Sequence, residues 1–455
     1  MYCVYSLLMG VAALVSAPYW IIRGARTGKY LSNVGARLGF ALAGLSGLAA
    51  KAGPKPIWIH AVSVGEVLAG VPLMKRLKET YPKRPLVIST TTATGQALAK
   101  ERVPFADAIF YFPFDWAFSV RKVLDAVKPA LIIVLETEIW PNFLRESRKR
   151  NIPVVFVSGR ISDRSFARYQ KYLGLFGFYL RPFFASALHD AQAFLMQTPT
   201  DADRIRTLGA PPERVRVDGN LKYDMALPEP TPLSAWLAEE CRRHQRWPVI
   251  VAGSVVATEE PLALIAFGVL QGDFRNALLV LAPRKPERFG AAADFIEESH
   301  RRFLRRSELP VAGPGIALKA NANVNGIPDD VTVILLDSIG ELASLYPLAD
   351  GAFVGGSLVE SGGHNILEPA AFGKVPVFGP SMQNFAEIAE RFVGAGAAIQ
   401  VESPEDAGVE WIHLLKDPEK MKRMGNTAKE LVESSRGALD RVMSEVSKQL
   451  GGASQ

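Results

Sequence analysis

Short apolar runs alternate with longer helix-like stretches along most of the chain, and the alternation occurs twice. Runs rich in valine, isoleucine and leucine, each followed by a helix-length segment, are typical of parallel strands that helices cover on both faces. The first set of predicted strands lies at residues 56–62, 85–92, 108–114, 131–136 and 153–159, and it ends near 214–220. The second set lies at residues 248–254, 277–283, 331–337, 351–357 and 375–380.

The pattern therefore predicts an α/β protein with two doubly wound, Rossmann-like domains in tandem. A proline-rich stretch at residues 227–236 is predicted to link them. We expect the first domain at residues 31–226 and the second at 237–416, facing each other across a cleft, with ligands at the carboxyl ends of the strands. Residues 417–455 form a C-terminal tail in which we predict one or two amphipathic helices.

The N-terminal segment carries no charged side chain from Cys3 to Ile22. About 20 helical residues can cross about 30 Å of hydrocarbon, so residues 1–30 are predicted to be a membrane anchor with a basic flank. The flanking cations are Arg23, Arg26, Lys29 and Arg37. They place the rest of the chain in the cytoplasm by the positive-inside rule, and they lie on the wrong side of the apolar run for a cleaved signal peptide. Pro18, next to two aromatic residues, also fits a shallow, monotopic insertion.

Composition and charge narrow the functional classes. Hydrophobic residues at 48% and charged residues at 22% indicate a globular chain, and 455 residues suit two domains. The net charge of +6 suggests an anionic partner, but no nucleic-acid motif accompanies it, so we predict no nucleic-acid partner. Cys3 and Cys241 are the only cysteines, and the six histidines lack metal-ligand spacing. We therefore expect a reducing compartment, no bound metal and no cofactor.

The strongest candidate ligand site is the glycine-rich stretch at residues 355–374. Two glycine pairs follow a predicted strand, and Asn365 is placed to cap a helix whose first turn carries Glu368. Glycine lets backbone approach a ligand closely, and the free N–H groups of a helix start attract phosphate, so we expect a phosphate near residues 363–365. Glu368 fits the capping-box spacing and could equally bind ribose hydroxyls. An ordinary capped helix after a loop is the alternative.

Two further strand ends of the second domain carry candidate donor-binding groups. Arg284 and Lys285 follow a predicted strand, where cations can neutralise a leaving phosphate or hold a sugar carboxylate. Gly253 and Ser254 follow another strand and could present backbone donors, although this signal alone is weak. A solvent-exposed basic loop is the alternative interpretation for the cations.

In the first domain, acidic and basic residues follow three predicted strands. Glu66 lies just after residues 56–62, and Glu136 and Glu138 lie at the end of the predicted strand at residues 131–136. Cations that follow residues 153–159 are predicted to face acidic head groups or phosphates: Arg160, Arg164, Arg168 and Lys171. The last three are four and three residues apart, which would place them on one helix face, although a solvated face is the commoner explanation of such a charge run.

Six motifs occur together, in order, behind the predicted anchor. They are HAVSVGE (60–66), ETEIWPN (136–142), GRISDRS (159–165), GNLKYD (219–224), APRKPERF (282–289) and GGHNILEPA (362–370). In this combination the chain resembles the 3-deoxy-D-manno-octulosonic acid (Kdo) transferase family of lipopolysaccharide synthesis. The resemblance covers nearly the whole chain from the anchor to about residue 400.

The resemblance implies a GT-B glycosyltransferase that moves Kdo from CMP-Kdo to the lipid A precursor, with inversion, at the inner face of the cell inner membrane. It makes Glu66 the catalytic base, places CMP in the second domain, and matches Arg284, Asn365 and Glu368 to family motif positions. A C-terminal tail that returns to the first domain is expected by analogy with GT-B enzymes.

The chain departs from the family pattern at three places. Lys285 stands where histidine is usual, Ile366 stands where proline is usual, and the loop at 252–260 lacks the more typical histidine and glycine. Two alternative functions remain at this stage: another GT-B transferase with a different nucleotide sugar and a lipid acceptor, and a membrane-tethered, inactive nucleotide-binding scaffold. A scaffold would need neither a base at Glu66 nor the positive charge at Arg284.

Overall fold

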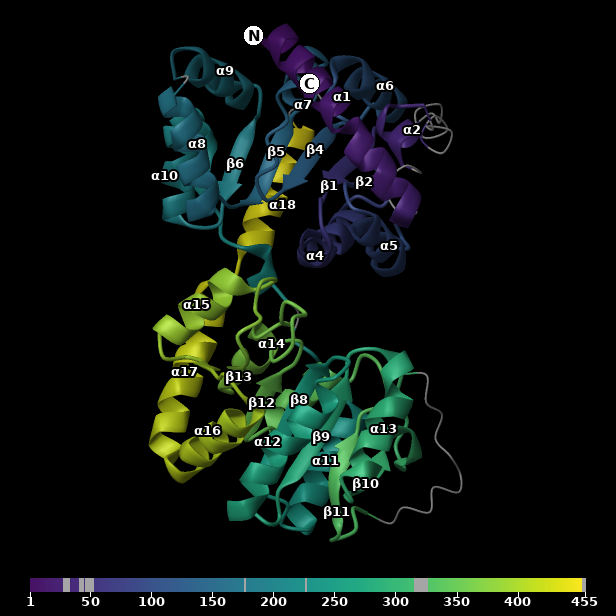
Figure 1. Ribbon diagram of the computed structural model, residues 1–455, viewed down its shortest axis with the longest axis vertical. Coiled ribbons are helices and arrows are strands. Elements are labelled where there is room, and N and C mark those ends of the chain that lie inside the picture. The colour runs from purple at the N-terminus through teal and green to yellow at the C-terminus, as the bar shows by residue number, and fades with distance from the viewer. Residues whose placement is uncertain are drawn as a thin grey trace. The chain divides into compact units, whose positions relative to one another are not determined.

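The computed structural model describes residues 1–27, 33–40, 45, 53–175, 177–225, 227–314 and 326–451. The chain forms two compact units (Figure 1), the first from Met1–Met225 with Ser435–Gln455 and the second from Ala226–Ser434. Lys29 of the predicted basic flank and the predicted boundary at residues 30 and 31 lie outside the described residues.

The first unit contains a parallel sheet in the order β3-β2-β1-β4-β5-β6-β7. Its strands are β1 Ile57–His60, β2 Leu86–Thr90, β3 Ala108–Tyr111, β4 Leu131–Leu135, β5 Val154–Gly159, β6 Ala193–Met196 and β7 Val215–Val217. Its helices are α1 Tyr2–Thr27, α2 Val34–Arg37, α4 Val64–Thr80, α5 Ala93–Arg102, α6 Ala117–Val127, α7 Pro141–Lys149, α8 Asp163–Leu175, α9 Gly177–His189, α10 Pro199–Thr207 and α18 Ala438–Gly451, with short 3-10 turns η1 Pro212–Arg214 and η2 Leu221–Tyr223.

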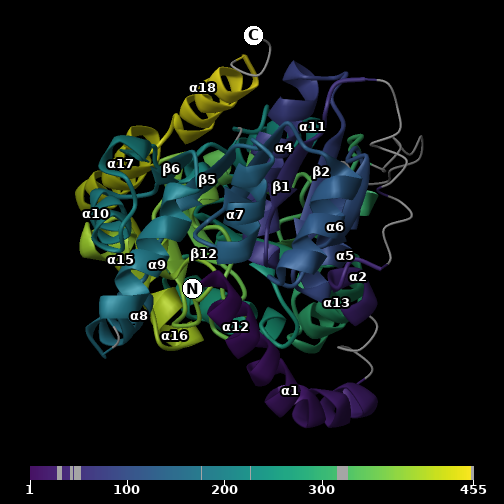
Figure 2. The same ribbon diagram turned by 90° about the horizontal axis from the view of Figure 1, so that it is seen from above.

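Helices cover both faces of this sheet (Figures 1 and 2), which explains why its central strands read as unbroken apolar runs. All residues of β1 and β4 are buried. Successive side chains point to opposite faces, so Trp58 and Ile132 pack in one core while Ile59 and Ile133 pack in the other.

The second unit repeats the architecture with the order β10-β11-β9-β8-β12-β13-β14, again parallel. Its strands are β8 Val249–Val255, β9 Leu278–Pro283, β10 Arg302–Arg305, β11 Val331–Leu335, β12 Gly351–Val354, β13 Pro376–Phe378 and β14 Ile399–Gln400. Its helices are α11 Pro232–Arg243, α12 Glu260–Asp273, α13 Phe289–Glu298, α14 Leu367–Ala370, α15 Ala386–Gly394, α16 Pro404–Lys416 and α17 Pro418–Ser434, with 3-10 turns η3 Pro286–Arg288, η4 Arg306–Glu308 and η5 Leu342–Leu348. The predicted fold class of two parallel-sheet α/β domains is confirmed.

Strand order reverses once in each sheet, and ligands of open parallel sheets bind where this happens. In the first unit β1 pairs with both β2 and β4, so the loops after β1 and β4 meet at the reversal. In the second unit β8 pairs with both β9 and β12, so the loops after β8 and β12 meet there. Glu66, in the first turn of α4, and the two glutamates after β4 lie at the first reversal. Ser254, near the end of β8, and the glycine-rich stretch lie at the second.

The C-terminal helices divide between the two units. Helix α17 packs on α14 and α16 of the second unit, whereas α18 packs on α4, β4 and η2 of the first, where Figure 1 shows it in yellow among blue elements. Asp224 of the GNLKYD motif holds the start of α18, because its carboxylate accepts hydrogen bonds from the backbone of Gly437 and Leu439, both at 2.6 Å. The chain therefore leaves the second unit near Ser434. Helix α11 begins at Pro232, inside the predicted linker at residues 227–236.

Candidate active site and family membership

Glu66 lies in the first turn of α4, directly after the central strand β1. Ser63 caps the helix through a hydrogen bond from the Glu66 amide to its hydroxyl at 3.4 Å. The carboxylate turns back toward the same loop: Oε2 accepts from the Val62 amide at 2.7 Å and Oε1 accepts from the Ser63 hydroxyl at 2.8 Å. Only 7% of Glu66 is exposed. The side chain is thus held in one position at the carboxyl end of β1.

The surroundings of Glu66 weaken its acidity. Burial and then the negative charge of Glu136 raise the pKa of Glu66 to about 7, against the hydrogen bonds from Val62 and Ser63, which lower it. Burial also raises the pKa of Glu138, whose charge acts on Glu66 as well. A carboxyl group that titrates near neutral pH can accept a proton from a substrate hydroxyl and release it again, as a general base must.

The loop after β4 brings the other two glutamates to this place through unusual backbone geometry. Glu136 has a φ of +58°, a left-handed conformation that is costly for a residue with a side chain. The next residue ties the loop to the end of β5, because the Thr137 hydroxyl accepts a hydrogen bond from the Arg160 amide at 2.8 Å. The sequence singled out Glu136 and Glu138 as strand-end acids, but gave no sign that they would act on Glu66.

Helix α8 carries the predicted basic stripe next to this acidic group. Arg164, Arg168 and Lys171 are all exposed on α8, and Arg160 is half-buried at the end of β5. Tyr169 of α8 is the residue that links the helix to these acids. Burial raises the pKa of its hydroxyl, and the negative charge of Glu138 raises this pKa as well. The four cations predicted from the sequence therefore lie directly after β5 and on α8, within the same unit as Glu66.

In the second unit, the loop after β9 places positive charge next to the glycine-rich loop. Arg284 follows β9 directly and its amide donates to the carbonyl of Val255 at 2.7 Å, which joins it to the end of β8. The positive charge of Arg284 affects the pKa of two side chains. Burial, and then this charge, lower the pKa of His364 to about 4. The same charge opposes the burial that raises the pKa of Glu368. Arg284 and Lys285 are exposed.

The glycine-rich loop turns through left-handed glycines into a very short helix. Gly362 and Gly363 have φ values of +86° and +70°. The Asn365 side chain accepts from the Leu367 amide at 3.1 Å and donates to Glu368 at 3.3 Å. Asn365 thus caps the first amide of the helix with its side chain, as predicted, although Ile366 holds the N-cap position and α14 spans only Leu367–Ala370. A single turn has little helix dipole, so the backbone turn and Arg284 are the stronger features for an anion here.

Comparison with known proteins places both units in one family. Residues 32–225 match the family described as 3-deoxy-D-manno-octulosonic-acid transferase (kdotransferase), and residues 312–431 match the glycosyl transferases group 1. The chain is 35% identical over 420 residues to the 3-deoxy-D-manno-octulosonic acid transferase of Haemophilus influenzae, covering 91% of each chain. The protein belongs to the Kdo transferase family. The Bordetella pertussis member is 32% identical, over 98% of this chain and 99% of its own. This chain is thus a glycosyltransferase, as the six motifs predicted.

One solved structure shares the fold of this Kdo transferase, and another aligns with its second unit. A UDP-N-acetylglucosamine 2-epimerase from Listeria monocytogenes aligns with a TM-score of 0.50 at 12% identity, covering 89% of this chain and 98% of that one. The C-terminal CMP-Kdo binding domain of WaaA from Acinetobacter baumannii aligns with 44% of this chain and 98% of its own, at 29% identity and a TM-score of 0.37.

Glu259, which the sequence did not single out, lies beside the candidate donor site of this Kdo transferase. It is fully buried just before α12, and its carboxylate accepts hydrogen bonds from four backbone amides. These come from Gly356 at 2.6 Å, Ser357 at 3.0 Å, Leu358 at 3.0 Å and Val256 at 3.2 Å. Three of the donors belong to the loop after β12, so Glu259 fixes the start of the glycine-rich loop to the loop after β8. The sequence feature that could have indicated Glu259 was the pair of adjacent glutamates, Glu259 and Glu260, after the predicted strand at residues 248–254.

The structure assigns Gly253 a packing role within this unit. The residue is buried, and a Cβ atom at this position would lie 2.2 Å from the Tyr346 hydroxyl, so only glycine leaves room for the tyrosine. Its carbonyl also accepts from the Gly355 amide at 2.8 Å. Ser254 is half-buried, with a φ of +56°. The predicted donor-binding role of Gly253 and Ser254 remains a prediction.

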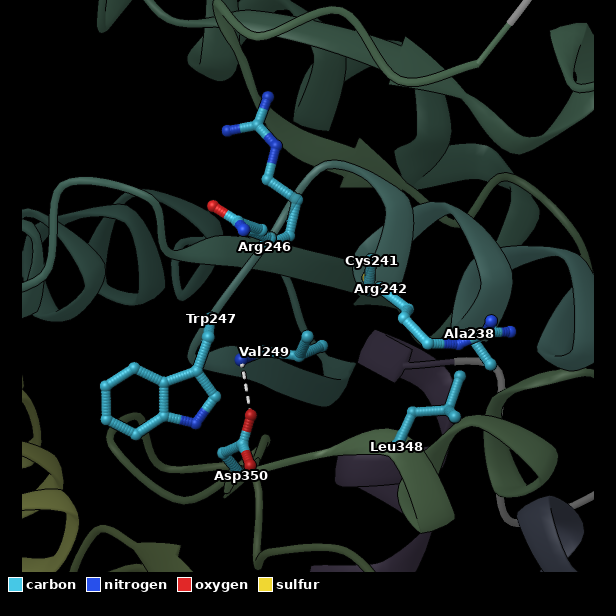
Figure 3. Close-up of a pocket in the computed structure, with 9 residues that line it drawn as sticks. Ala238, Cys241, Arg242, Arg246, Trp247, Val249, Leu348 and Asp350 are labelled. Carbon is cyan, nitrogen blue, oxygen red and sulfur yellow. Dashed lines mark hydrogen bonds between the residues drawn. The ribbon is translucent and has the colours of Figure 1, made fainter.

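A hollow of about 390 Å³ in the second unit lies away from these loops (Figure 3). It is lined by Trp247, Val249 and Leu348 among others, and the Val249 amide donates to the Asp350 carboxylate at 2.8 Å. Val249 begins β8 and Asp350 immediately precedes β12, so the hollow lies at the amino ends of these parallel strands. The glycine-rich loop lies at their carboxyl ends. This hollow is therefore separate from the candidate donor site.

No cluster of three or more histidine, cysteine, aspartate or glutamate side chains suited to a metal ion occurs among the described residues. The acidic group around Glu66 does not form such a cluster either. The expectation that the reaction proceeds without a bound metal or cofactor remains a prediction.

Proposed function

We propose that this chain transfers Kdo from CMP-Kdo to lipid IVA, the lipid A precursor, with inversion at the anomeric carbon. The observation that carries the proposal is the Glu66 carboxyl group, buried at the carboxyl end of β1 with its pKa raised to about 7, in a chain of the Kdo transferase family. Catalysis of this kind needs a base that is unprotonated in a useful fraction at neutral pH.

In the proposed reaction Glu66 accepts the proton of the attacking acceptor hydroxyl. The hydroxyl oxygen forms a bond to the anomeric carbon of Kdo while the bond from that carbon to the CMP phosphate oxygen breaks. CMP leaves with the bonding electron pair. Because the hydroxyl attacks the face opposite the leaving group, the configuration inverts. Glu136 and Glu138 favour proton uptake by Glu66 through their negative charge.

The second unit supplies the proposed donor site. Arg284 and Lys285 would balance the charge that develops on CMP as it leaves. Gly363, Asn365 and Glu368 would hold the nucleotide, with Gly253 and Ser254 on the neighbouring strand end. Lys285 keeps the positive charge where the family usually has histidine, and Ile366 leaves Asn365 and Glu368 in register, so these departures are compatible with the proposed donor.

The proposed location is the cytoplasmic face of the cell inner membrane. Helix α1 supports it, because residues Tyr2–Tyr19 have a mean hydropathy of 1.5 and none of them is buried. The exposed cations of α8, with Arg160, would meet the phosphates of the acceptor and of anionic lipids.

The proposal is tested by mass spectrometry of tetraacylated lipid A precursor after incubation with CMP-Kdo and the full-length protein. Wild type should yield Kdo adducts and Glu66→Gln should not, while both bind CMP in a calorimetric titration. Glu79→Gln, an exposed change on the same helix, is the matched control and should behave as wild type. Absence of adducts from wild type that binds CMP would refute the acceptor assignment. The anomeric configuration of the product, read by NMR, tests inversion.

A further inference from the structure

The first turns of α1 are attached to the first unit by polar and aromatic contacts. The Tyr2 hydroxyl donates to Asp190 at 3.2 Å, just beyond α9, and the Tyr2 ring packs edge-on against Phe183 of α9 at 5.1 Å. The Ser6 hydroxyl accepts from the Asn142 side chain of α7 at 3.0 Å. Figures 1 and 2 both show the N-terminus beside α7 and α9. The start of α1 is thus part of the first unit's surface.

A buried carboxylate completes this attachment. Asp115 is 1% exposed and accepts from the amides of Asn142 at 3.0 Å and Phe143 at 2.7 Å, so it lies at the start of α7. The Tyr5 hydroxyl forms a hydrogen bond with the same carboxylate. Separating α1 from the unit would leave Asp115 with one fewer hydrogen bond and expose the faces of two tyrosines.

The chain that follows α1 returns to the first unit within a few residues. Helix α1 ends at Thr27 and α2 begins at Val34. In α2, the Arg37 side chain donates to the carbonyl of Phe112 at 3.0 Å, and the Arg37 carbonyl accepts from the Phe114 amide at 2.9 Å. Both the beginning of α1 and the segment after it are therefore held on the same unit, next to residues 112–115.

The remaining face of α1 is apolar and exposed. Its large exposed side chains recur at helical spacing and are 52–80% exposed: Val4, Leu7, Leu8, Val11, Leu14 and Val15. Tyr2, Tyr5, Ser6 and Met9, which recur at the same spacing on another face, are partly buried. A helix that spans a bilayer by itself would have lipid on every side. Here one face contacts protein and another carries the apolar stripe.

We propose that α1 is a monotopic anchor that lies in the membrane interface with its apolar stripe in the lipid, and that its N-terminus stays on the side of the catalytic units. A span would carry Tyr2 across about 30 Å of hydrocarbon and break the contacts that Tyr2, Tyr5 and Ser6 make with the first unit. An interfacial helix usually turns a charged face to water. In α1, the face opposite the lipid instead packs against the first unit. This inference deepens the proposed membrane location and rests on it.

The side of the N-terminus is tested by thiol labelling. A Gly-Ser-Cys extension is placed before Met1 in the full-length chain with Cys3→Ser and Cys241→Ser, which leaves one thiol in water under either topology and adds no charge. A membrane-impermeant maleimide is applied to spheroplasts and to inverted inner-membrane vesicles. Labelling only in inverted vesicles is expected. Labelling in intact spheroplasts would overturn the proposal. Neither readout depends on catalysis, so failure of this inference is distinct from failure of the proposed reaction.

The lipid contact is tested by flotation with vesicles of phosphatidylcholine and phosphatidylglycerol. Wild type should float, and the double variant Leu7→Glu/Leu14→Glu should lose flotation, since two charges would enter the lipid. Val409→Glu, at an exposed apolar position on α16, is the matched control and should float as wild type does. Retained CMP binding shows that each variant is folded. Flotation of the Leu7→Glu/Leu14→Glu variant at the wild-type level would refute the lipid-facing stripe.

Discussion

The carboxylate of Glu259 lies 2.6 Å from the amide nitrogen of Gly356, although 97 positions separate the two residues in the chain. Through this contact and its three further amide hydrogen bonds, a side chain without direct access to solvent determines the path of the glycine-rich loop.

Replacement of Glu259 by glutamine should weaken donor binding more than the chemical step. The amide nitrogen of glutamine would face backbone donors, which costs about 1–3 kcal/mol and lets the loop move. We expect KM for CMP-Kdo to rise about tenfold or more while kcat changes less, as a loss of about 1.4 kcal/mol or more in binding implies. Steady-state kinetics and CMP titration measure this.

Glu240→Gln provides the control for Glu259. Glu240 is also buried and also accepts a backbone hydrogen bond, from Ile327 at 3.1 Å, but it belongs to α11 rather than to the strand-end loops. An equal rise in KM for both variants would mean that general destabilisation, and not loop position, explains the effect.

The pH dependence of the reaction should report Glu66. The base must be unprotonated, and its pKa is raised to about 7, so kcat/KM should fall about tenfold per unit as the pH drops below that value. Glu66→Gln should lower kcat by about 10²–10⁴-fold and remove this limb. A wild-type profile that stays flat from pH 5 to 8 would contradict the assignment.

The same group should make the protein less stable at high pH. Glu66 has a higher pKa folded than unfolded, so the folded state binds more protons between about 4.5 and about 7, and stability falls as the pH rises through this range. Glu66→Gln should therefore be inactive yet more stable than wild type at pH 8, by up to about 3 kcal/mol, with a smaller difference or none at pH 4. Thermal melts at the two pH values measure this, and a gain that is equal at both would argue against the titration.

Loss of one partner from a buried ion pair in the second unit should destabilise the protein. Arg306 and Glu341 are both 0% exposed and joined by two hydrogen bonds, at 2.8 and 2.9 Å, and Arg306 also donates to the carbonyl of Val311 at 2.9 Å. Arg306→Met would leave the glutamate buried without its partner and should cost about 3–5 kcal/mol. Urea unfolding measures this. Arg302→Met, at an exposed pair, is the control and should cost less than about 1 kcal/mol.

Charge reversal on α8 should separate lipid binding from catalysis. The double variant Arg164→Glu/Arg168→Glu places negative charge on an exposed helix face, so activity on acceptor embedded in anionic membranes should fall. Activity on acceptor in neutral detergent micelles should change less, because the repelling lipid is absent. Unchanged activity on the anionic membranes would exclude these two residues from the membrane-facing surface.

The sequence by itself determined the elements and their class. Apolar runs of strand length, such as residues 131–136 with their one terminal glutamate, predicted a parallel sheet because a strand buried on both faces needs apolar side chains along its length. The same patterns located Glu66, Arg284 and the glycine-rich loop at strand ends. Short strands were missed. No residue of β10 or β14 is fully buried, so their sequences carry little periodic signal. Strand β6, Ala193–Met196, is fully buried, but four residues are too short a run to stand out.

The tertiary structure alone decided what these residues contact. Glu66 has its raised pKa because folding buries it and brings Glu136 near, and Glu259 has its role because β8 and β12 are neighbours in the sheet. Helix α18 belongs to the first unit because Asp224 accepts hydrogen bonds at its start, although the whole second unit lies between the two in the sequence. Local periodicity records which side chains are buried, whereas electrostatic shifts and hydrogen bonds depend on groups that only the completed fold brings together.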